Sequence, residues 1–129
     1  MTNIEAILKN THSVAIVGLS NNPARASYGV AQYLMAFYKV IPVNPKYEQI
    51  LGLTCYPDLA SIPEPVDMVD VFQRSENVMP FVEPAIAMGA SCFWMQLDIR
   101  NSQARQALEQ AGISVVEDKC TKIEHARYA

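Results

Sequence analysis

The sequence predicts an α/β fold of one domain, an open and doubly wound sheet of about five mostly parallel strands with helices on both faces. Short runs rich in Val and Ile alternate along the chain with segments whose apolar residues have helical spacing. Parallel strands need crossover connections, which are right-handed and place helices against the sheet. The chain has 129 residues, enough for a single domain, which we expect over residues 1–129.

The chain opens with a helix and a strand. Thr2 stands three positions before Glu5, the spacing of a capping box, and a helix is predicted over residues 4–10. Residues 14–17 are an unbroken apolar run, typical of a strand that is buried on both faces. Open parallel sheets bind ligands beyond the carboxyl ends of their strands, so we expect a crevice after this strand.

Gly18 ends the first strand and allows the chain to turn tightly. The spacing of the apolar residues predicts a helix over residues 28–38, with Ser27 as its N-cap. Residues 39–43 form the second predicted strand. Because Pro42 has no N–H to donate, this strand is expected to border an edge or a gap in the sheet.

The middle of the chain gives mixed signals before the third strand. Residues 49–56 indicate a turn or a short strand, and residues 59–63 indicate a brief helical turn. Residues 66–72 form the third strand, which carries Asp67 and Asp70. Side chains three positions apart point to opposite faces of a strand, so we interpret these aspartates as structural and not as a catalytic carboxylate pair.

Two further pairs of helix and strand complete the alternation. Ser75 is the expected N-cap of a helix over residues 75–88, and residues 91–95 form the fourth strand. The next helix stops at Gly112, and residues 113–117 form the last strand. The charged tail that follows is compatible with a helix at its end.

The composition limits the function classes. Half of the residues are hydrophobic and the net charge is −3, which argues against general binding to nucleic acid or to a membrane surface. We see neither a secretion signal at the amino end nor an apolar run near the roughly 20 residues of a spanning helix. We therefore expect a cytoplasmic protein, and an oligomeric assembly stays open.

The cysteines do not indicate chemistry. Cys55, Cys92 and Cys120 are odd in number and widely spaced, so we predict neither a disulfide framework nor a zinc site. Cys92 lies in an apolar run and is interpreted as a core residue. With no convincing general base, nucleophile or metal cluster, the sequence favours a binding module over an enzyme.

The loops after the first two strands point to the kind of ligand. A dinucleotide-binding fold would show the pattern GxGxxG and an acidic residue after the second strand. Here Gly18 is followed by no glycine until Gly29, and the second strand ends in Asn44, Pro45 and Lys46. A lysine in that place favours a ribose that carries a phosphate, as in NADP or in a 3′-phosphorylated nucleotide such as coenzyme A.

The first loop adds further groups that bind anions. Arg25 supplies a second cation, and Ser20 and Ser27 supply hydroxyl donors. Backbone N–H groups of the loop and the start of the next helix are expected to converge on the same place. Together these residues predict one half of a phosphate-binding site.

Four segments carry a resemblance to a known family: VAIVGLSNNPARASYGVAQYL, VIPVNPKY, DMVDVFQRSENV and CTKIEHAR. They resemble the small stand-alone CoA-binding-domain proteins, whose Rossmann-like fold is similar to the amino-terminal domain of the succinyl-CoA synthetase alpha subunit. The similarity covers nearly the whole chain, and the four motifs occur in the same order at compatible spacing.

The resemblance implies that coenzyme A or an acyl-CoA lies across the ends of the strands. The residues that it implies in binding are Gly18, Leu19, Ser20, Arg25, Asn44, Pro45, Lys46, Val71, Phe72, Met95 and Gln96. Gly29 departs from the larger, often basic residue expected in the family. The second domain of the synthetase, with its phosphohistidine segment, has no counterpart here, so ligase chemistry is not implied. Cys120 and His125 lie in the tail motif without an assigned role.

Three functions follow from this sequence. The leading one is a binding module for coenzyme A or an acyl-CoA, without catalytic apparatus. The second is an NADP-dependent oxidoreductase in which Arg25 and Lys46 hold the 2′-phosphate, although the GxGxxG pattern is missing. The third is a regulatory or scaffold module that keeps the fold without a ligand, against which the clustered donors argue.

Overall fold

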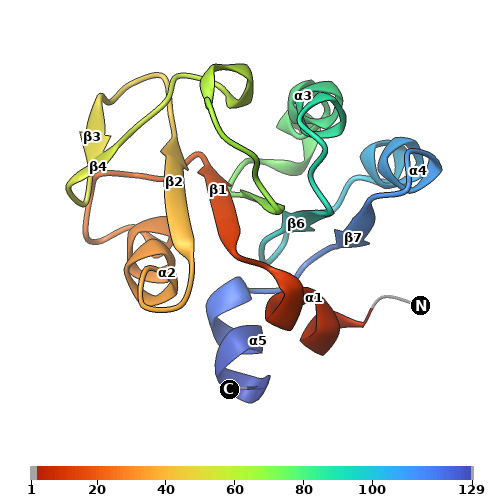
Figure 1. The fold of residues 1–129 in the computed structure, drawn as a ribbon, viewed down its shortest axis with the longest axis horizontal. Helices are drawn as coiled ribbons and strands as arrows, with labels where there is room; N and C mark the ends of the chain where they lie inside the picture. The colour runs from red at the N-terminus through yellow and green to blue at the C-terminus, as the bar shows by residue number, and fades with distance from the viewer. Residues whose placement is uncertain (1–2, 129) are drawn as a thin grey trace.

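The computed structural model of the chain describes residues 3–128 and shows the predicted parallel sheet at its centre (Figure 1). The strands are β1 (Ser13–Val17), β2 (Lys39–Val43), β5 (Met68–Val71), β6 (Cys92–Met95) and β7 (Ser114–Val116). They pair in parallel in the order β2-β1-β5-β6-β7. Every residue of β1 is buried, which confirms the interpretation of the unbroken apolar run 14–17 as a strand covered on both faces. The residues of β5 and β6 are buried as well.

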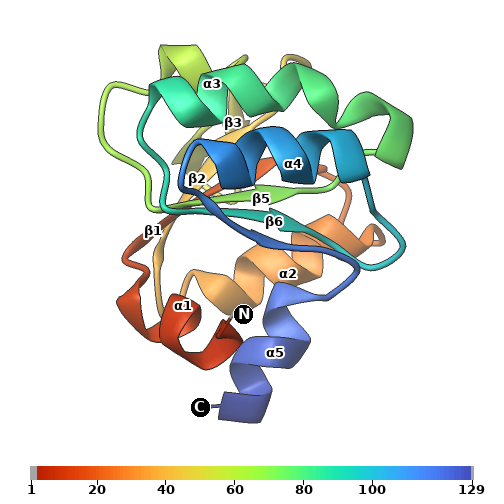
Figure 2. The same cartoon turned by 90° about the vertical axis from the view of Figure 1, so that its right-hand side faces the viewer.

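The helices form one layer on each side of the sheet. They are α1 (Ile4–Asn10), α2 (Ala26–Leu34), α3 (Val82–Ala87), α4 (Ser102–Gln110) and α5 (Thr121–Tyr128). Figure 2 shows α3 and α4 over one face and α1, α2 and α5 over the other. The fold is therefore the expected α/β, Rossmann-like arrangement with helices on both faces.

Alternating residues of each strand supply two hydrophobic cores. Val17 and Phe93 belong to the core beneath α3 and α4. Ile16 and Trp94 belong to the core beneath α1, α2 and α5. Because successive side chains of a strand point to opposite faces, each strand serves both cores at once.

The outer edge of β2 is partly covered by the segment that follows it. The short strands β3 (Gln49–Ile50) and β4 (Leu53–Thr54) form a hairpin, the turn or short strand predicted there. After β4, the N–H of Tyr56 donates to the carbonyl of Pro42 at 3.0 Å. The N–H and C=O of a strand residue point to the same side, so the donor that Pro42 lacks would face outward. The prediction of an edge strand is confirmed.

Of the predicted N-caps, Ser27 is wrong and Thr2 cannot be assessed. The helix α2 begins at Ala26, and its N-cap is Arg25. Ser27 lies inside the first turn, where its hydroxyl accepts a hydrogen bond from the N–H of Ser20 at 3.0 Å, so a contact with the preceding loop replaces the predicted cap. Thr2 lies outside the described residues, and the N-cap of α1 is Asn3, whose side chain accepts from the N–H of Ala6 at 3.0 Å.

The predicted helix over residues 75–88 is three shorter pieces. These are the 3₁₀ turns η2 (Ser75–Asn77) and η3 (Met79–Phe81), followed by α3. Ser75 does not cap a helix, because its hydroxyl accepts from the N–H of Arg100 at 3.0 Å instead. The earlier 3₁₀ turn η1 (Leu59–Ser61) is the brief helical turn that the sequence indicates. The charged tail forms α5.

The strand order creates a crevice where the chain reverses direction across the sheet. From β1 the chain moves to β2 on one side, and it then crosses to β5 on the other side of β1. In doubly wound sheets, ligands bind at the carboxyl ends of the strands at this switch point. The residues that follow β1, β2 and β5 are therefore the ones that the fold brings to the candidate site.

Gly18→Ala is expected to destabilise the protein. Gly18 has a φ of +81°, and a Cβ at this position would collide with the carbonyl oxygen of Phe72. The positive φ alone costs about 1–3 kcal/mol for a residue with a side chain, and the collision adds to that cost. Urea unfolding, followed by the fluorescence of the single tryptophan, measures the loss.

Gly29→Ala is the matched control. Gly29 lies in α2, and a Cβ there would meet nothing within 4 Å. This substitution is expected to stabilise the protein by about 0.5–1 kcal/mol, because alanine loses less conformational entropy than glycine in a helix. Equal effects of the two substitutions would contradict the special role of Gly18.

Candidate functional site

A hollow of about 710 Å³ lies at the carboxyl ends of β1, β2 and β5. We call it the basic hollow. Its lining residues are Val17, Gly18, Ser20, Asn22, Arg25, Val43, Asn44, Pro45, Lys46, Tyr47, Pro57, Phe72, Gln73, Arg74, Asn77 and Phe81. The hollow therefore lies at the switch point, and it brings together the loops that follow the first two strands, as the sequence predicts.

Three exposed cations line the basic hollow: Arg25, Lys46 and Arg74. No Asp or Glu is among the described residues that line it. None of the three forms an ion pair or a side-chain hydrogen bond with another described residue, whereas Arg100 and Arg105 each pair with a carboxylate. The positive charge of the hollow is therefore uncompensated within the described part of this acidic chain, and it favours an anionic ligand.

Backbone contacts bind the three loops to one another. Gly18 donates its N–H to the carbonyl of Val43 at 2.9 Å, and Phe72 donates to the carbonyl of Val17 at 2.9 Å. The side-chain amide of Asn44 donates to the carbonyl of Leu19 at 3.0 Å. These bonds continue the strand pairing past the ends of the strands and fix the floor of the basic hollow.

The first loop uses much of its own hydrogen-bonding capacity. The N–H of Asn22 donates to the hydroxyl of Ser20 at 3.0 Å, and the N–H of Ala24 donates to the side chain of Asn22 at 2.9 Å. Free backbone donors lie at the start of α2, where the sequence also predicts them. No described residue accepts a hydrogen bond from the N–H of Ala26 or of Ser27, so the positive end of this helix can face an anion.

A second hollow, of about 590 Å³, adjoins the first and extends toward the end of β6. We call it the Gln96 hollow. The residues that it shares with the basic hollow are Gly18, Ser20, Arg25, Phe72, Gln73 and Arg74. Those that line it alone are Ala26, Ser27, Val30, Gln96, Leu97, Asp98, Ile99 and Cys120. The two hollows form one crevice with a basic part and a less polar part.

A buried polar network lies behind the Gln96 hollow. Asp70, fully buried in β5, accepts hydrogen bonds from Gln96 Nε2 at 2.5 Å and from the hydroxyl of Thr121 at 2.9 Å. Burial raises the pKa of Asp70 to about 7, against the lowering effect of the two hydrogen bonds. Asp67, by contrast, accepts from the N–H of His12 at the start of β1. The two aspartates thus contact different parts of the chain, and their interpretation as structural stays a prediction.

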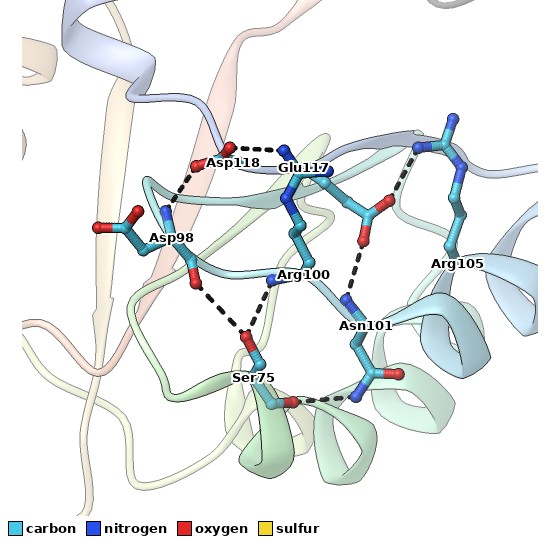
Figure 3. A network of polar contacts seen from close by, with 7 residues as sticks. All are labelled: Ser75, Asp98, Arg100, Asn101, Arg105, Glu117 and Asp118. Carbon is cyan, nitrogen blue, oxygen red and sulfur yellow. Dashed lines mark hydrogen bonds and ion pairs between the residues drawn. The ribbon is translucent and has the colours of Figure 1, made fainter.

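A second network, at the same edge of the sheet, ties the loops after β5, β6 and β7 together (Figure 3). Asp118 accepts from the N–H of Asp98 at 2.7 Å and pairs with Arg100 at 2.7 Å. Glu117 accepts from the N–H of Asn101 at 2.8 Å. Asp98 and Asp118 have φ values of +68° and +59°, an uncommon backbone conformation for residues other than glycine. The network holds the outer wall of the Gln96 hollow in this shape.

Nine of the residues predicted for binding line one or both hollows: Gly18, Ser20, Arg25, Ser27, Asn44, Pro45, Lys46, Phe72 and Gln96. Leu19, Val71 and Met95 do not, because their side chains are fully buried in the two cores. These three residues support the loops from beneath. Direct binding by any of the predicted residues stays a prediction.

Sequence reasoning missed Arg74 and Asp98 as residues of the crevice. Arg74 follows β5 closely, and its place just past a strand end at the switch point was a usable signal. Asp98 reaches the crevice through a backbone turn with positive φ, for which the sequence carries no such signal.

Among residues 3–128 there is no group of three or more His, Cys, Asp or Glu side chains that could hold a metal, and no helix suited to crossing a membrane. Burial raises the pKa of the Cys92 thiol, which makes it unreactive. His125 lies away from the crevice, where its Nδ1 contacts the hydroxyl of Tyr33 at 2.8 Å. Cys120 is buried and lines the Gln96 hollow.

Asp70 is expected to make stability depend on pH. Its pKa rises from 3.8 in the unfolded chain to about 7 in the folded protein, so the folded state holds this proton more tightly. That contribution to stability is fully present below about pH 4 and is lost as the pH rises through about 7. The free energy of unfolding of the wild type, minus that of Asp70→Asn, should fall between those pH values in urea titrations. A constant difference would contradict the raised pKa.

Comparisons with known proteins give one family model and proteins similar over nearly the whole chain. The model of the CoA binding domain matches residues 12–126. The chain is 38% identical to YneT of Bacillus subtilis (strain 168) over 124 residues, which cover 95% of this chain and 92% of YneT. A solved structure of a protein from Pyrococcus horikoshii OT3 has a TM-score of 0.94 and 39% identity, and it covers 97% of this chain and 89% of that protein.

A longer relative shares one segment. The ADP-forming acetate–CoA ligase of Methanocaldococcus jannaschii is 35% identical over 57 residues, which are 43% of this chain but 8% of the ligase. The chain thus matches a small part of that enzyme and nearly all of YneT. By its matching residues and its fold, this chain belongs to the CoA-binding domain family.

Proposed function

We propose that the protein binds coenzyme A or an acyl-CoA in the crevice at the carboxyl end of the sheet, and that it acts as a binding module. The observation that carries the proposal is the basic hollow, with three unpaired cations and no carboxylate among its described lining residues. Coenzyme A carries a pyrophosphate and a 3′-phosphate on one nucleotide, and this concentration of negative charge matches the hollow. Membership of the family supports the same ligand.

The pyrophosphate is assigned to the start of α2, where the two hollows meet, because Arg25 lines both hollows and Ala26 and Ser27 line the Gln96 hollow beside it. Arg25 is the N-cap of this helix, and the N–H groups of Ala26 and Ser27 are free among the described residues. A helix amino terminus with free N–H groups favours phosphate, and an adjacent arginine adds hydrogen bonds of fixed geometry. This end of the crevice would therefore fix the middle of the ligand.

The 3′-phosphate is assigned to Lys46. In doubly wound folds, the residues after the second strand read the ribose, and a carboxylate there holds its free hydroxyls. Here the turn after β2 presents Lys46, whose N–H donates to the side chain of Asn44 at 2.9 Å. The exposed ammonium group has no partner among the described residues and can pair with a phosphate on the ribose.

Ligand-dependent stability tests the proposal. Coenzyme A at about a hundred times its dissociation constant should raise the free energy of unfolding by about 2.7 kcal/mol. The measurement is a thermal unfolding series with coenzyme A, acetyl-CoA, NADP, NAD and ADP. A shift with NADP but none with coenzyme A would replace the proposed ligand, and no shift with any of them would favour a scaffold role.

Lys46→Met should lower the affinity for coenzyme A about tenfold, because one charge-assisted hydrogen bond at an exposed position is lost. The same variant should affect 3′-dephospho-CoA little, since that ligand lacks the phosphate in question. Isothermal titration gives both affinities. Lys9→Met is the matched control, because Lys9 is an exposed lysine outside both hollows that pairs with Glu5. Equal losses for the two ligands would remove the role of Lys46.

A further inference from the structure

The Gln96 hollow is suited to a neutral part of a ligand. Its own walls carry the apolar side chains of Val30, Leu97 and Ile99. Asp98 is the one carboxylate among the described residues that line either hollow, and it would repel a phosphate placed beside it. A ligand whose 3′-phosphate lies in the basic hollow and whose pyrophosphate lies beside Arg25, where the two hollows meet, would therefore extend an uncharged segment into the rest of the Gln96 hollow.

Gln96 has its side-chain amide held in one orientation. Above its pKa of about 7, Asp70 is ionised and only accepts hydrogen bonds, so it faces the NH₂ group of Gln96, at 2.5 Å. The hydroxyl of Thr121 donates its proton to Asp70, at 2.9 Å, and its oxygen accepts the second N–H of Gln96, at 2.8 Å. Both protons of the Gln96 amide are thus used, and the three side chains fix one another.

The carbonyl oxygen of Gln96 is left as an acceptor at the hollow. Gln96 is 3% exposed, and no described residue donates to its Oε1. Every fully buried side-chain nitrogen or oxygen among the described residues has a partner, so this oxygen reaches the surface of the hollow that Gln96 lines. An acceptor at the surface of the hollow can receive a ligand N–H in place of water.

We propose that Gln96 Oε1 accepts a hydrogen bond from an amide N–H of the ligand's pantetheine arm, and that Asp70 is the positioning residue that turns this oxygen toward the hollow. The inference rests on the proposed function, because it assumes that the nucleotide occupies the basic hollow. The arm of coenzyme A is uncharged and contains two secondary amides, each with an N–H to donate. The Gln96 hollow thus distinguishes coenzyme A from nucleotides that lack such an arm.

The test compares coenzyme A with adenosine 3′,5′-bisphosphate, which keeps the phosphorylated nucleoside and lacks the arm. Gln96→Leu should lower the affinity for coenzyme A by about five- to tenfold, since the arm then meets no acceptor. Asp70→Asn should weaken it by about two- to threefold, because asparagine can donate as well as accept and lets the Gln96 amide take both orientations. The affinity for adenosine 3′,5′-bisphosphate should stay unchanged in both variants.

Phe93→Leu is the control for a loss of packing. Phe93 is fully buried in the core beneath α3 and α4, and it lines neither hollow, so the ratio of the two affinities should not change. The nearly isosteric Asp70→Asn keeps the test decisive if Gln96→Leu fails to fold. If the Gln96 and Asp70 variants lose affinity for both ligands equally, or lose no affinity for coenzyme A, this inference alone is overturned. Failure of the wild-type protein to bind either ligand would overturn the proposed function itself.

Discussion

The close approach of Gly18 to the carbonyl of Phe72 is the constraint on which the crevice depends. A side chain at Gly18 would occupy the place of that carbonyl oxygen, and the positive φ of Gly18 turns the chain at the same point. The contact allows the loops after β1 and β5 to meet directly above the sheet. Because both hollows are lined by Gly18 and Phe72, a change in this contact would alter the basic and the less polar parts of the crevice together.

The sheet was predictable because burial on both faces leaves a local signal. Residues 14–17 are apolar without interruption, and the structure places them inside the sheet, between β2 and β5. The N-caps were not predictable in the same way, because the hydrogen-bond partner of a serine hydroxyl depends on which groups the fold brings near it. The hydroxyl of Ser27 accepts from the N–H of Ser20, and the hydroxyl of Ser75 accepts from the N–H of Arg100. A helical sequence pattern contains no signal for either contact. Tertiary contacts decided both positions.

The same distinction between local signals and tertiary contacts applies to the candidate site. Arg25 and Lys46 were predictable as residues of one crevice because each follows a strand end, and topology brings these ends together. The orientation of Gln96 depends on Asp70 and Thr121, which are 51 positions apart in the sequence. Their hydrogen bonds arise from the pairing of β5 with β6 and from the return of α5 to the sheet, so no spacing rule reveals them.

A buried carboxylate beside the crevice costs stability when it is ionised, and that cost has a structural consequence. An apolar residue in place of Asp70 would avoid it, but the amide of Gln96 would then lose the acceptor that fixes its orientation. Ionised Asp70 accepts from both neighbours, and this asymmetry points the remaining acceptor of Gln96 toward the ligand. Recognition of a phosphate needs only uncompensated charge at a surface, as in the basic hollow. Recognition of a neutral amide needs an oriented acceptor, and a rigid buried network of this kind provides one.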